Sequence, residues 1–328
     1  MSDFKHSGPT LDRMGFGGAP LGDMYAHSDD DRARETLATA WQHGIRYYDT
    51  APHYGAGLSE QRFGSFLARK PRSEYVLSTK VGRVLEPAEE PEATGPFVGG
   101  LYFKRRLDYS YDGAKQAVHD SLQRMGVGYL DIVYIHDLSP DALGDAWTDY
   151  FATAMAGAAR ALTEMRDQGL IHGWGLGVNT IEPCLRALDE ADPDVFLLAT
   201  QYHLLNTAGA DELFPRCLDR DVSVVVGAPF GSGLLAGGDH YLYQKATEES
   251  IRTRDRMAEI CRGHGVDLKA AALQFSAAHP AVDSIIPGAS KPERIPQNKA
   301  LFETDIPAEL WAEFKREGLL PASAYVPD

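Results

Sequence analysis

Short apolar segments alternate with amphipathic segments along almost the whole chain. Eight β-rich runs, counting one that opens at Met14, are each followed by a stretch with helical spacing. The later runs are 45–48, 75–79, 130–135, 173–178, 195–200, 222–226 and 282–287. Such alternation predicts a parallel sheet, and eight units in 328 residues favour a closed barrel. We therefore expect an α/β protein, a single (β/α)8 TIM barrel with its active site at the C-terminal mouth of the strands and one domain over residues 1–328.

The expected helices and loops fill the gaps between these strands. Asp29, Asp30 and Asp31 cap a helix that runs to Trp41, and Gly44 ends it. The other expected helices are 58–69, 112–125, 150–168, 184–190, 213–220, 248–264, 267–279 and 291–302. Residues 82–111, rich in Pro, Gly and aromatics, are expected to form one long loop. The run 14–22 is glycine-rich like a dinucleotide fingerprint, but its spacing is wrong and its proline opposes a helix start.

The overall charge excludes some classes of partner. The chain has 32 Lys and Arg against 47 Asp and Glu, a net charge of −15. Such an acidic protein is a poor match for nucleic acid or an anionic membrane. Cys184, Cys217 and Cys261 lack paired spacing, which indicates neither a disulfide framework nor a zinc site. The N-terminus has no apolar signal-peptide core and no run is long enough to span a bilayer, so a cytoplasmic setting is expected.

Polar residues stand at the carboxyl ends of five expected strands. They are Asp49, Lys80, His136, Asn179 and Gln201. In a barrel these ends gather at one mouth, where such proteins keep their chemistry. Buried ionisable groups need partners, so Asp49 and Lys80 are expected to pair. A lysine cation beside Tyr54 would lower the pKa of the tyrosine, which suits Tyr54 as the proton donor or acceptor.

Each of these residues also has a plainer interpretation. Asp49 could be a helix N-cap, and Tyr54 could be a loop residue that packs on the surface. Lys80 could be a solvated lysine at a strand end. His136 could orient a substrate oxygen, or it could form a metal pair with Asp137 as in a metal-dependent barrel hydrolase. Only the combination of these residues, in this order along the chain, favours a lined catalytic site over the plainer readings.

Three segments together match a known family. The runs 44–55, 78–80 and 134–136 resemble the aldo-keto reductase superfamily, and the resemblance extends over nearly the whole chain. It implies a catalytic tetrad: Asp49, Tyr54, Lys80 and His136. The tyrosine would be the general acid/base, with hydride passing to or from a nicotinamide. The resemblance also implies that Asn179 and Gln201 hold the nicotinamide carboxamide, which offers both a donor and an acceptor.

The same resemblance implies where the cofactor binds. Run 231–235 looks like the loop over the pyrophosphate, and run 286–294 like the segment around the adenosine. Arg294 either pairs a 2′-phosphate or lies on a solvated helix face. Gly288 and Ala289 stand where many NADP-dependent members have a lysine and a serine or threonine, so NAD and NADP both stay open. The expected cofactor contacts are Gly18, Ala19, Asp49, Asn179, Gln201, Phe230, Ser232, Gly233, Leu234, Gly288, Ser290, Arg294, Gln297 and Asn298.

Two further features refine the resemblance. Gly227 stands where many relatives place an aromatic that stacks on the nicotinamide, and either Phe230 substitutes for it or no residue does. The runs 96–101, 108–113 and 120–125 look like the bacterial aldose dehydrogenase branch. That branch includes D-threo-aldose and L-fucose 1-dehydrogenases and a pyridoxal 4-dehydrogenase. Its enzymes oxidise a sugar's anomeric hydroxyl to a lactone, or an alcohol to an aldehyde or lactone.

We therefore expect an NAD(P)-dependent oxidoreductase that oxidises a sugar-like hydroxyl, such as the C1 hydroxyl of an aldose, or reduces the carbonyl. The alternatives are a pyridoxal 4-dehydrogenase or a general aldehyde or ketone reductase, and, from another class, a nucleotide-binding regulatory scaffold with little turnover. The expected substrate contacts are His53, Phe97, Tyr102 and Asp137, although the aromatics could simply cover the barrel mouth. The expected partner is a small molecule, with no metal, nucleic acid or membrane, and the protein is expected to be a monomer or small homo-oligomer.

Overall fold

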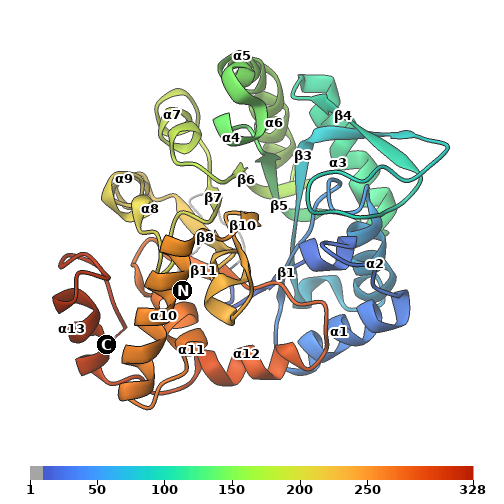
Figure 1. The fold of residues 1–328 in the computed structure, drawn as a ribbon. Coiled ribbons are helices and arrows are strands. Elements are labelled where there is room, and N and C mark those ends of the chain that lie inside the picture. The colour runs from blue at the N-terminus through green and yellow to red at the C-terminus, as the bar shows by residue number, and fades with distance from the viewer. Residues whose placement is uncertain (1–9, 328) are drawn as a thin grey trace.

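The structure is a computed structural model that describes residues 10–327. Residues 1–9 and 328 are not described, so the expected absence of a signal peptide at the N-terminus lies outside the described residues. Figure 1 shows the helices arranged around a central set of strands. Within residues 10–327, no helix is long and apolar enough to cross a membrane.

Eight parallel strands of the described chain form the barrel. In sheet order they are β1 (Phe16–Gly17), β2 (Tyr47–Asp49), β3 (Val76–Pro87), β5 (Leu130–His136), β6 (Ile171–Val178), β7 (Val195–Ala199), β8 (Ser223–Gly227) and β11 (Val282–Ile286). Bridges from Met14 to Ile285 and from Gly17 to Gly288 close the ring between its first and last strands. Because the strands run in one direction, their carboxyl ends converge at one mouth. The predicted (β/α)8 barrel is confirmed.

Most predicted helices are present, with ends that differ by a few residues. They are α1 (Asp30–Gln42), α2 (Leu58–Leu67), α3 (Tyr111–Met125), α7 (Glu182–Glu190), α9 (Leu213–Asp219), α10 (Glu248–Gly263), α11 (Leu268–Ala278) and α12 (Arg294–Phe302). The Asp29 side chain caps α1, as expected. The predicted helix 150–168 instead comprises α5 (Trp147–Ala154), a π-helical turn and α6 (Arg160–Asp167). Three helices were not predicted: α4 (Pro140–Leu143), α8 (Ala208–Asp211) and α13 (Ala308–Arg316).

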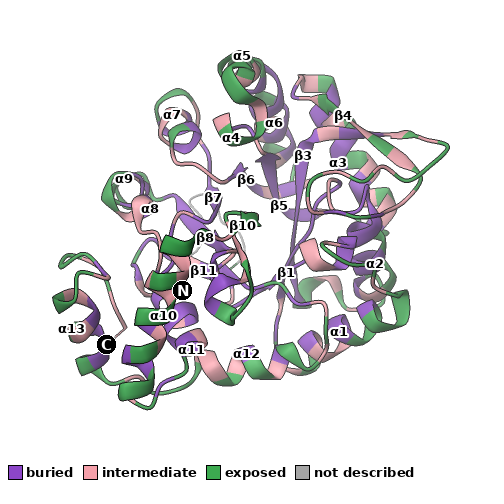
Figure 2. Ribbon diagram, viewed as in Figure 1, coloured by how far each residue is buried: buried purple, intermediate pink, exposed green. Residues whose placement is uncertain are grey.

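The strands are buried on both faces, which explains why their sequences are so apolar. Figure 2 shows the strands buried and the outward faces of the helices exposed. One apolar cluster combines Leu11, which precedes β1, with side chains from alternate positions of the strands: Tyr47, Val76, Ile132, Tyr134, Val195, Leu197, Val225 and Ile286. A larger cluster, which includes Trp174, Phe275 and Trp311, packs the helices against the outside of the strands. Two-sided burial of this kind requires nearly continuous apolar runs.

Beyond the barrel rim, β3 continues into a two-stranded arm. Its outer part, Gly82–Pro87, pairs antiparallel with β4 (Phe103–Asp108). The prediction of a single loop over 82–111 is therefore wrong at both of its ends. Gly82 makes the bend possible, because its φ is 104° and a Cβ there would lie 2.4 Å from Cε1 of Tyr109. The arm extends the chain beyond the mouth immediately after the end of the barrel strand.

Candidate active site

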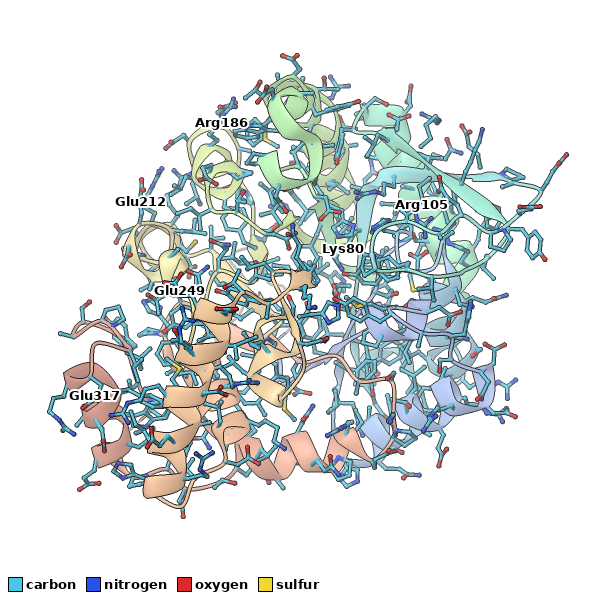
Figure 3. All side chains as sticks on the ribbon, in the orientation of Figure 1. Lys80, Arg105, Arg186, Glu212, Glu249 and Glu317 are labelled. Carbon is cyan, nitrogen blue, oxygen red and sulfur yellow. The ribbon has the colours of Figure 1, made fainter. Side chains whose placement is uncertain are left out.

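A buried ion pair lies at the ends of neighbouring strands β2 and β3. Lys80 Nζ donates to Asp49 Oδ2 at 2.7 Å and to the Thr50 carbonyl at 2.8 Å. Ser78 Oγ donates to the other carboxylate oxygen at 2.7 Å. Figure 3 shows Lys80 well inside the ring of helices, and its side chain is 1% exposed. Burial lowers the pKa of Lys80 and raises that of Asp49, while each partner's charge opposes these shifts. The expected pairing is present.

Tyr54 lies beside this pair, on the turn that follows β2. Lys80 Nζ is 4.7 Å from the centre of the Tyr54 ring, and Phe97 stacks on that ring with centroids 5.5 Å apart. Burial raises the pKa of Tyr54 well above its ordinary value, and the charge of Asp49 raises it further. The pKa of Tyr54 thus moves in the direction opposite to the expected one, because burial and the charges of Asp49 and Asp137 outweigh the lowering by Arg83.

His136 is the last residue of β5, and its ring packs against the ring of Tyr54. Its ring meets the Tyr54 ring edge to face, with centroids 5.8 Å apart, and the His53 ring at the same distance. Burial lowers the pKa of His136 well below its ordinary value, so the imidazole is neutral at neutral pH. A neutral imidazole can donate one hydrogen bond to a substrate oxygen. The structure thus brings all four residues of the predicted tetrad together.

A cleft of about 630 Å³ begins at Asp49 and Tyr54 and continues to the start of α12. Its wall includes most of the predicted cofactor contacts: Gly18, Ala19, Asp49, Phe230, Ser232, Gly233, Gly288, Ser290, Arg294 and Asn298. These residues come from both ends of the chain, because the ring closes between β1 and β11. The cleft therefore connects the tetrad with the segments that the sequence assigned to the pyrophosphate and the adenosine.

The walls of this cleft fit a dinucleotide. Gly231, Ser232 and Gly233 have successive left-handed φ values of 55°, 57° and 107°. The N–H groups of Gly231 and Gly233 donate to the carbonyls of Ala228 and Phe230, which fixes the shape of this loop beside the cleft. A Cβ on Gly233 would meet no atom within 4 Å, so space for a ligand lies in front of this backbone. Lys269 and Lys291 stand on the wall and supply positive charge for phosphates. The chemistry of the cleft therefore agrees with a nicotinamide cofactor.

Four predicted cofactor contacts lie off this wall. Asn179 and Gln201 line a second cavity of about 730 Å³, and Asn179 Nδ2 donates to Asp141 Oδ2 at 2.9 Å. Leu234 is fully buried, and Gln297 Oε1 accepts from the guanidinium of Arg294 at 3.3 Å. The structure does not bring the two predicted amides to the cleft, because the chain after each strand end directs them to the second cavity.

Tyr243 is among the residues at the site that were not predicted. Tyr243 stands at the turn between β9 (His240–Tyr241) and β10 (Gln244–Lys245), and it lines both cavities. Its backbone N–H donates to Ser232 Oγ at 3.1 Å. Burial raises the pKa of Tyr243, and the nearby charge of Tyr54 adds to the rise. The Tyr-Leu-Tyr run soon after the glycine-rich loop was the signal that could have identified it.

Three of the four predicted substrate contacts surround the tetrad. His53 and Phe97 pack edge to face with centroids 5.1 Å apart, and Asp137 Oδ1 is 3.5 Å from His136 Nε2. Tyr102 comes directly before β4 and is 63% exposed, so it is not packed against the tetrad, and its contact with substrate stays a prediction. Arg83, which pairs with Asp137, was missed, although it follows Lys80 by only three positions.

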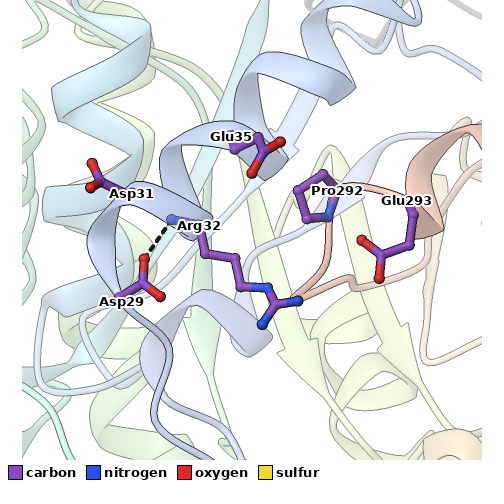
Figure 4. A pocket seen from close by; sticks show the side chains of 6 residues that line it. All are labelled: Asp29, Asp31, Arg32, Glu35, Pro292 and Glu293. Atoms are coloured by element: carbon purple, nitrogen blue, oxygen red, sulfur yellow. Dashed lines mark hydrogen bonds between the residues drawn. The ribbon is translucent and has the colours of Figure 1, made fainter.

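A third, open cavity of about 500 Å³ adjoins the far part of the cofactor cleft. Its lining residues are Asp29, Asp31, Arg32, Glu35, Pro292 and Glu293. Figure 4 shows these carboxylates around the side chain of Arg32, whose backbone N–H donates to Asp29. Because Lys291 and Arg294 on the cleft wall flank Pro292 and Glu293, this acidic surface borders the segment predicted to hold the adenosine.

Comparison with known proteins identifies the family. The model of the Aldo/keto reductase family matches residues 13–316. The chain belongs to the aldo/keto reductase family. Over 325 residues it is 36% identical to D-threo-aldose 1-dehydrogenase from a Pseudomonas species, and over 330 residues it is 39% identical to pyridoxal 4-dehydrogenase from Microbacterium luteolum; each match covers 96% of both chains. The holo form of an aldo-keto reductase from Bacillus halodurans has a TM-score of 0.73 at 25% identity, covering 99% of this chain and 98% of that one.

This aldo/keto reductase is an NAD(P)-dependent oxidoreductase that acts on CH–OH groups. The expected family, enzyme class and cofactor type are thereby confirmed. Membership in the family also removes the metal-dependent hydrolase as an interpretation of His136 and Asp137. The Asp49–Lys80 pair, Tyr54 and His136 therefore lie in the active site of an oxidoreductase, and the cleft beside them is a candidate site for its nicotinamide cofactor.

Proposed function

We propose that this aldo/keto reductase oxidises the C1 hydroxyl of an aldose to the lactone, or reduces the corresponding carbonyl, with NAD(P). The observation that carries the proposal is the buried Asp49–Lys80 pair beside Tyr54 and His136, at the end of a cleft that fits a dinucleotide. The aldose dehydrogenase among its relatives supports this substrate class. Oxidation of a pyridoxal-type alcohol is the second candidate, favoured by the 39% identity to pyridoxal 4-dehydrogenase.

In the proposed mechanism Tyr54 is the general acid/base. The residues of the cleft wall would hold a nicotinamide, which would supply hydride chemistry and, in its oxidised form, a positive charge. Lys80 is held over the Tyr54 ring by Asp49, so the cation stays fixed although both groups are buried. His136 donates a hydrogen bond to the substrate oxygen and orients it toward the tyrosine hydroxyl. Each residue thus binds, orients or moves a proton at the reacting oxygen.

The state of Tyr54 sets the favoured pH for each direction. Because its pKa is raised, the hydroxyl is protonated at neutral pH and ready to donate to a carbonyl oxygen. Alcohol oxidation instead needs the phenolate, which becomes more abundant as the pH rises toward this pKa. We therefore expect reduction to be fastest near neutral pH and oxidation to accelerate in alkaline solution.

We further propose that NAD is the preferred cofactor. The proposed contacts are those on the cleft wall, which includes both Gly227 and Phe230. Gly288 and Ala289 offer no side-chain donors to a 2′-phosphate, and the carboxylates around Glu293 would repel one. Asn179 and Gln201 would contact the carboxamide only after their side chains turn from the second cavity. We also propose that residues 1–328 form one domain and act on a small molecule in the cytoplasm, as a monomer or small homo-oligomer.

A substrate screen tests the proposal. Purified protein is assayed for NADH or NADPH formation with a panel of aldoses and pyridoxal-type alcohols, and for their consumption with simple aldehydes. We expect turnover with at least one aldose or pyridoxal-type alcohol, and a higher kcat/KM with NAD than with NADP. Cofactor binding without turnover of any of these compounds would contradict the proposal and favour the nucleotide-binding regulatory scaffold.

A further inference from the structure

A second, partly buried ion pair lies next to the tetrad. Arg83 Nη2 is 2.9 Å from Asp137 Oδ2, and the two side chains are 13% and 17% exposed. The other carboxylate oxygen of Asp137 is 3.5 Å from His136 Nε2. The charge of Arg83 lowers the pKa of both His136 and His53. This pair therefore belongs to the mouth of the barrel and not to its outer surface.

The backbone is in a left-handed conformation at Asp137 and at Gly82, the residue before Arg83. Arg83 follows Gly82, where φ is 104° and the chain leaves the barrel for the arm. Asp137 itself has a φ of 49°, a left-handed conformation that costs energy for a residue with a side chain. Its backbone N–H donates to the Gly177 carbonyl at 2.9 Å, which keeps it at the end of β5. The surrounding structure thus fixes where the guanidinium points.

Two buried polar atoms near this pair lack a hydrogen-bond partner in the described part of the chain. They are Arg83 Nη1 and His53 Nδ1. A buried donor without a partner costs free energy, so such atoms are rare and call for a ligand or water. Arg105, on the neighbouring strand of the arm, shows the contrast: its nitrogens donate to the His53 carbonyl, to Glu92 and to Thr94. The nitrogens of Arg105 are used to hold the residues around Glu92 and Thr94, whereas Nη1 of Arg83 has no hydrogen-bond partner in the described part of the chain.

We propose that Arg83 is a specificity-determining residue, which donates from Nη1 to a hydroxyl oxygen of the substrate close to the carbon that reacts. Asp137 is a positioning residue that aims the guanidinium. This inference rests on the proposed function, and it adds the substrate feature that the site selects: a hydroxyl group near the reacting carbonyl or carbinol. A neutral His53, whose pKa burial lowers to about 2, is the second polar group available to the same hydroxyl.

The test compares two three-carbon aldehydes that differ only in hydroxyl groups. Reduction of glyceraldehyde and of propanal by NADH is measured for wild type, Arg83→Met and Arg83→Lys. The readout is the ratio of the two kcat/KM values, because any effect on folding or on Tyr54 enters both. A charge-assisted hydrogen bond corresponds to about 10- to 100-fold in this ratio. We expect wild type to prefer glyceraldehyde, Arg83→Met to lose that preference, and Arg83→Lys to keep part of it.

Two further variants separate the proposed role from a structural one. Arg106→Met removes an exposed cation from the same arm, where it pairs with Glu86 and Asp108, and it should leave the ratio unchanged. Asp137→Asn should lower the ratio as Arg83→Met does, and Asp137→Glu should restore part of it. An unchanged ratio in Arg83→Met, or no preference for glyceraldehyde in wild type, would overturn the role of Arg83 and leave the proposed function standing. Wild type that turns over neither aldehyde and no aldose or pyridoxal-type alcohol would overturn the proposed function together with it.

Discussion

Replacing Lys80 by methionine tests the central ion pair. The variant Lys80→Met keeps a side chain of similar length but removes the cation from Asp49, whose side chain is 2% exposed. It also removes the hydrogen bond to the Thr50 carbonyl. A buried carboxylate left without its partner costs about 3–5 kcal/mol, which in a chain of 328 residues corresponds to a melting temperature lower by roughly 4–7 °C. Thermal unfolding followed by circular dichroism measures this difference.

The loss of stability should depend on pH in a defined direction. Burial already raises the pKa of Asp49, and Lys80 is the charge that opposes the rise. Without Lys80 the folded-state pKa moves further up, while the unfolded value stays at about 3.9. A carboxyl with a raised folded-state pKa contributes stability that is present below the unfolded pKa and is lost as the pH rises through the folded one. The melting-temperature gap to wild type should therefore be smaller at about pH 5 than at about pH 8.

The double variant Asp49→Asn/Lys80→Met is the control for this argument. It removes both charges, so most of the stability lost at high pH should return and the dependence on pH should flatten. Equal losses in Lys80→Met at both pH values would refute the reasoning that an uncompensated carboxylate is the cause. A double variant as unstable as Lys80→Met would refute it as well, because lost packing would then explain the effect.

Three further predictions concern the tyrosine, the cofactor and the arm. Tyr54→Phe should lower kcat by roughly 10²- to 10⁴-fold, with the cofactor Kd from fluorescence titration changed by less than about 2-fold; near-normal turnover would exclude Tyr54 as the acid/base. If the Arg294 guanidinium contacts a 2′-phosphate, Arg294→Ala should lower kcat/KM with NADP, relative to kcat/KM with NAD, by about 10-fold. An unchanged ratio would indicate that the Arg294 side chain lies on a solvated face of the helix. Gly82→Ala should lose about 1–3 kcal/mol, because the new Cβ would lie 2.4 Å from Tyr109, whereas Gly128→Ala, with no atom within 4 Å, should melt like wild type.

The barrel could be predicted because its strands are buried on both faces. Runs such as β5 (Leu130–His136) and β8 (Ser223–Gly227) are buried throughout, and few other elements require such continuous apolar sequence. A polar residue at the end of such a run stands out, which is why Lys80 and His136 could be located. The arm lacked this signal, because β4 (Phe103–Asp108) is half exposed and rich in charge, a pattern that a loop shares.

The direction of a side chain beyond a strand end could not be predicted in the same way. Asn179 follows β6 as expected, yet its amide donates to Asp141, a residue on a helix that the sequence pattern did not reveal. Tyr102 was placed near substrate on its residue type alone, and its exposure depends on how the arm folds. Arg83 fell inside the expected loop 82–111, although in the structure it lies within β3. Only its long-range pairing with Asp137 distinguishes it.

The direction of the Tyr54 pKa shift could not be predicted from residue types alone. A lone cation beside a phenol lowers its pKa, but here Lys80 Nζ is 2.7 Å from a carboxylate oxygen of Asp49 and 4.7 Å from the centre of the phenol ring. Because the carboxylate is the nearer partner, it cancels much of the cation's field at the tyrosine, and burial then determines the direction of the shift. Tyr54 therefore rests protonated, so donation to a carbonyl needs no further charge at neutral pH. Alcohol oxidation depends on positive charge from outside the pair, and within the described chain Arg83 is the residue whose charge lowers the pKa of Tyr54.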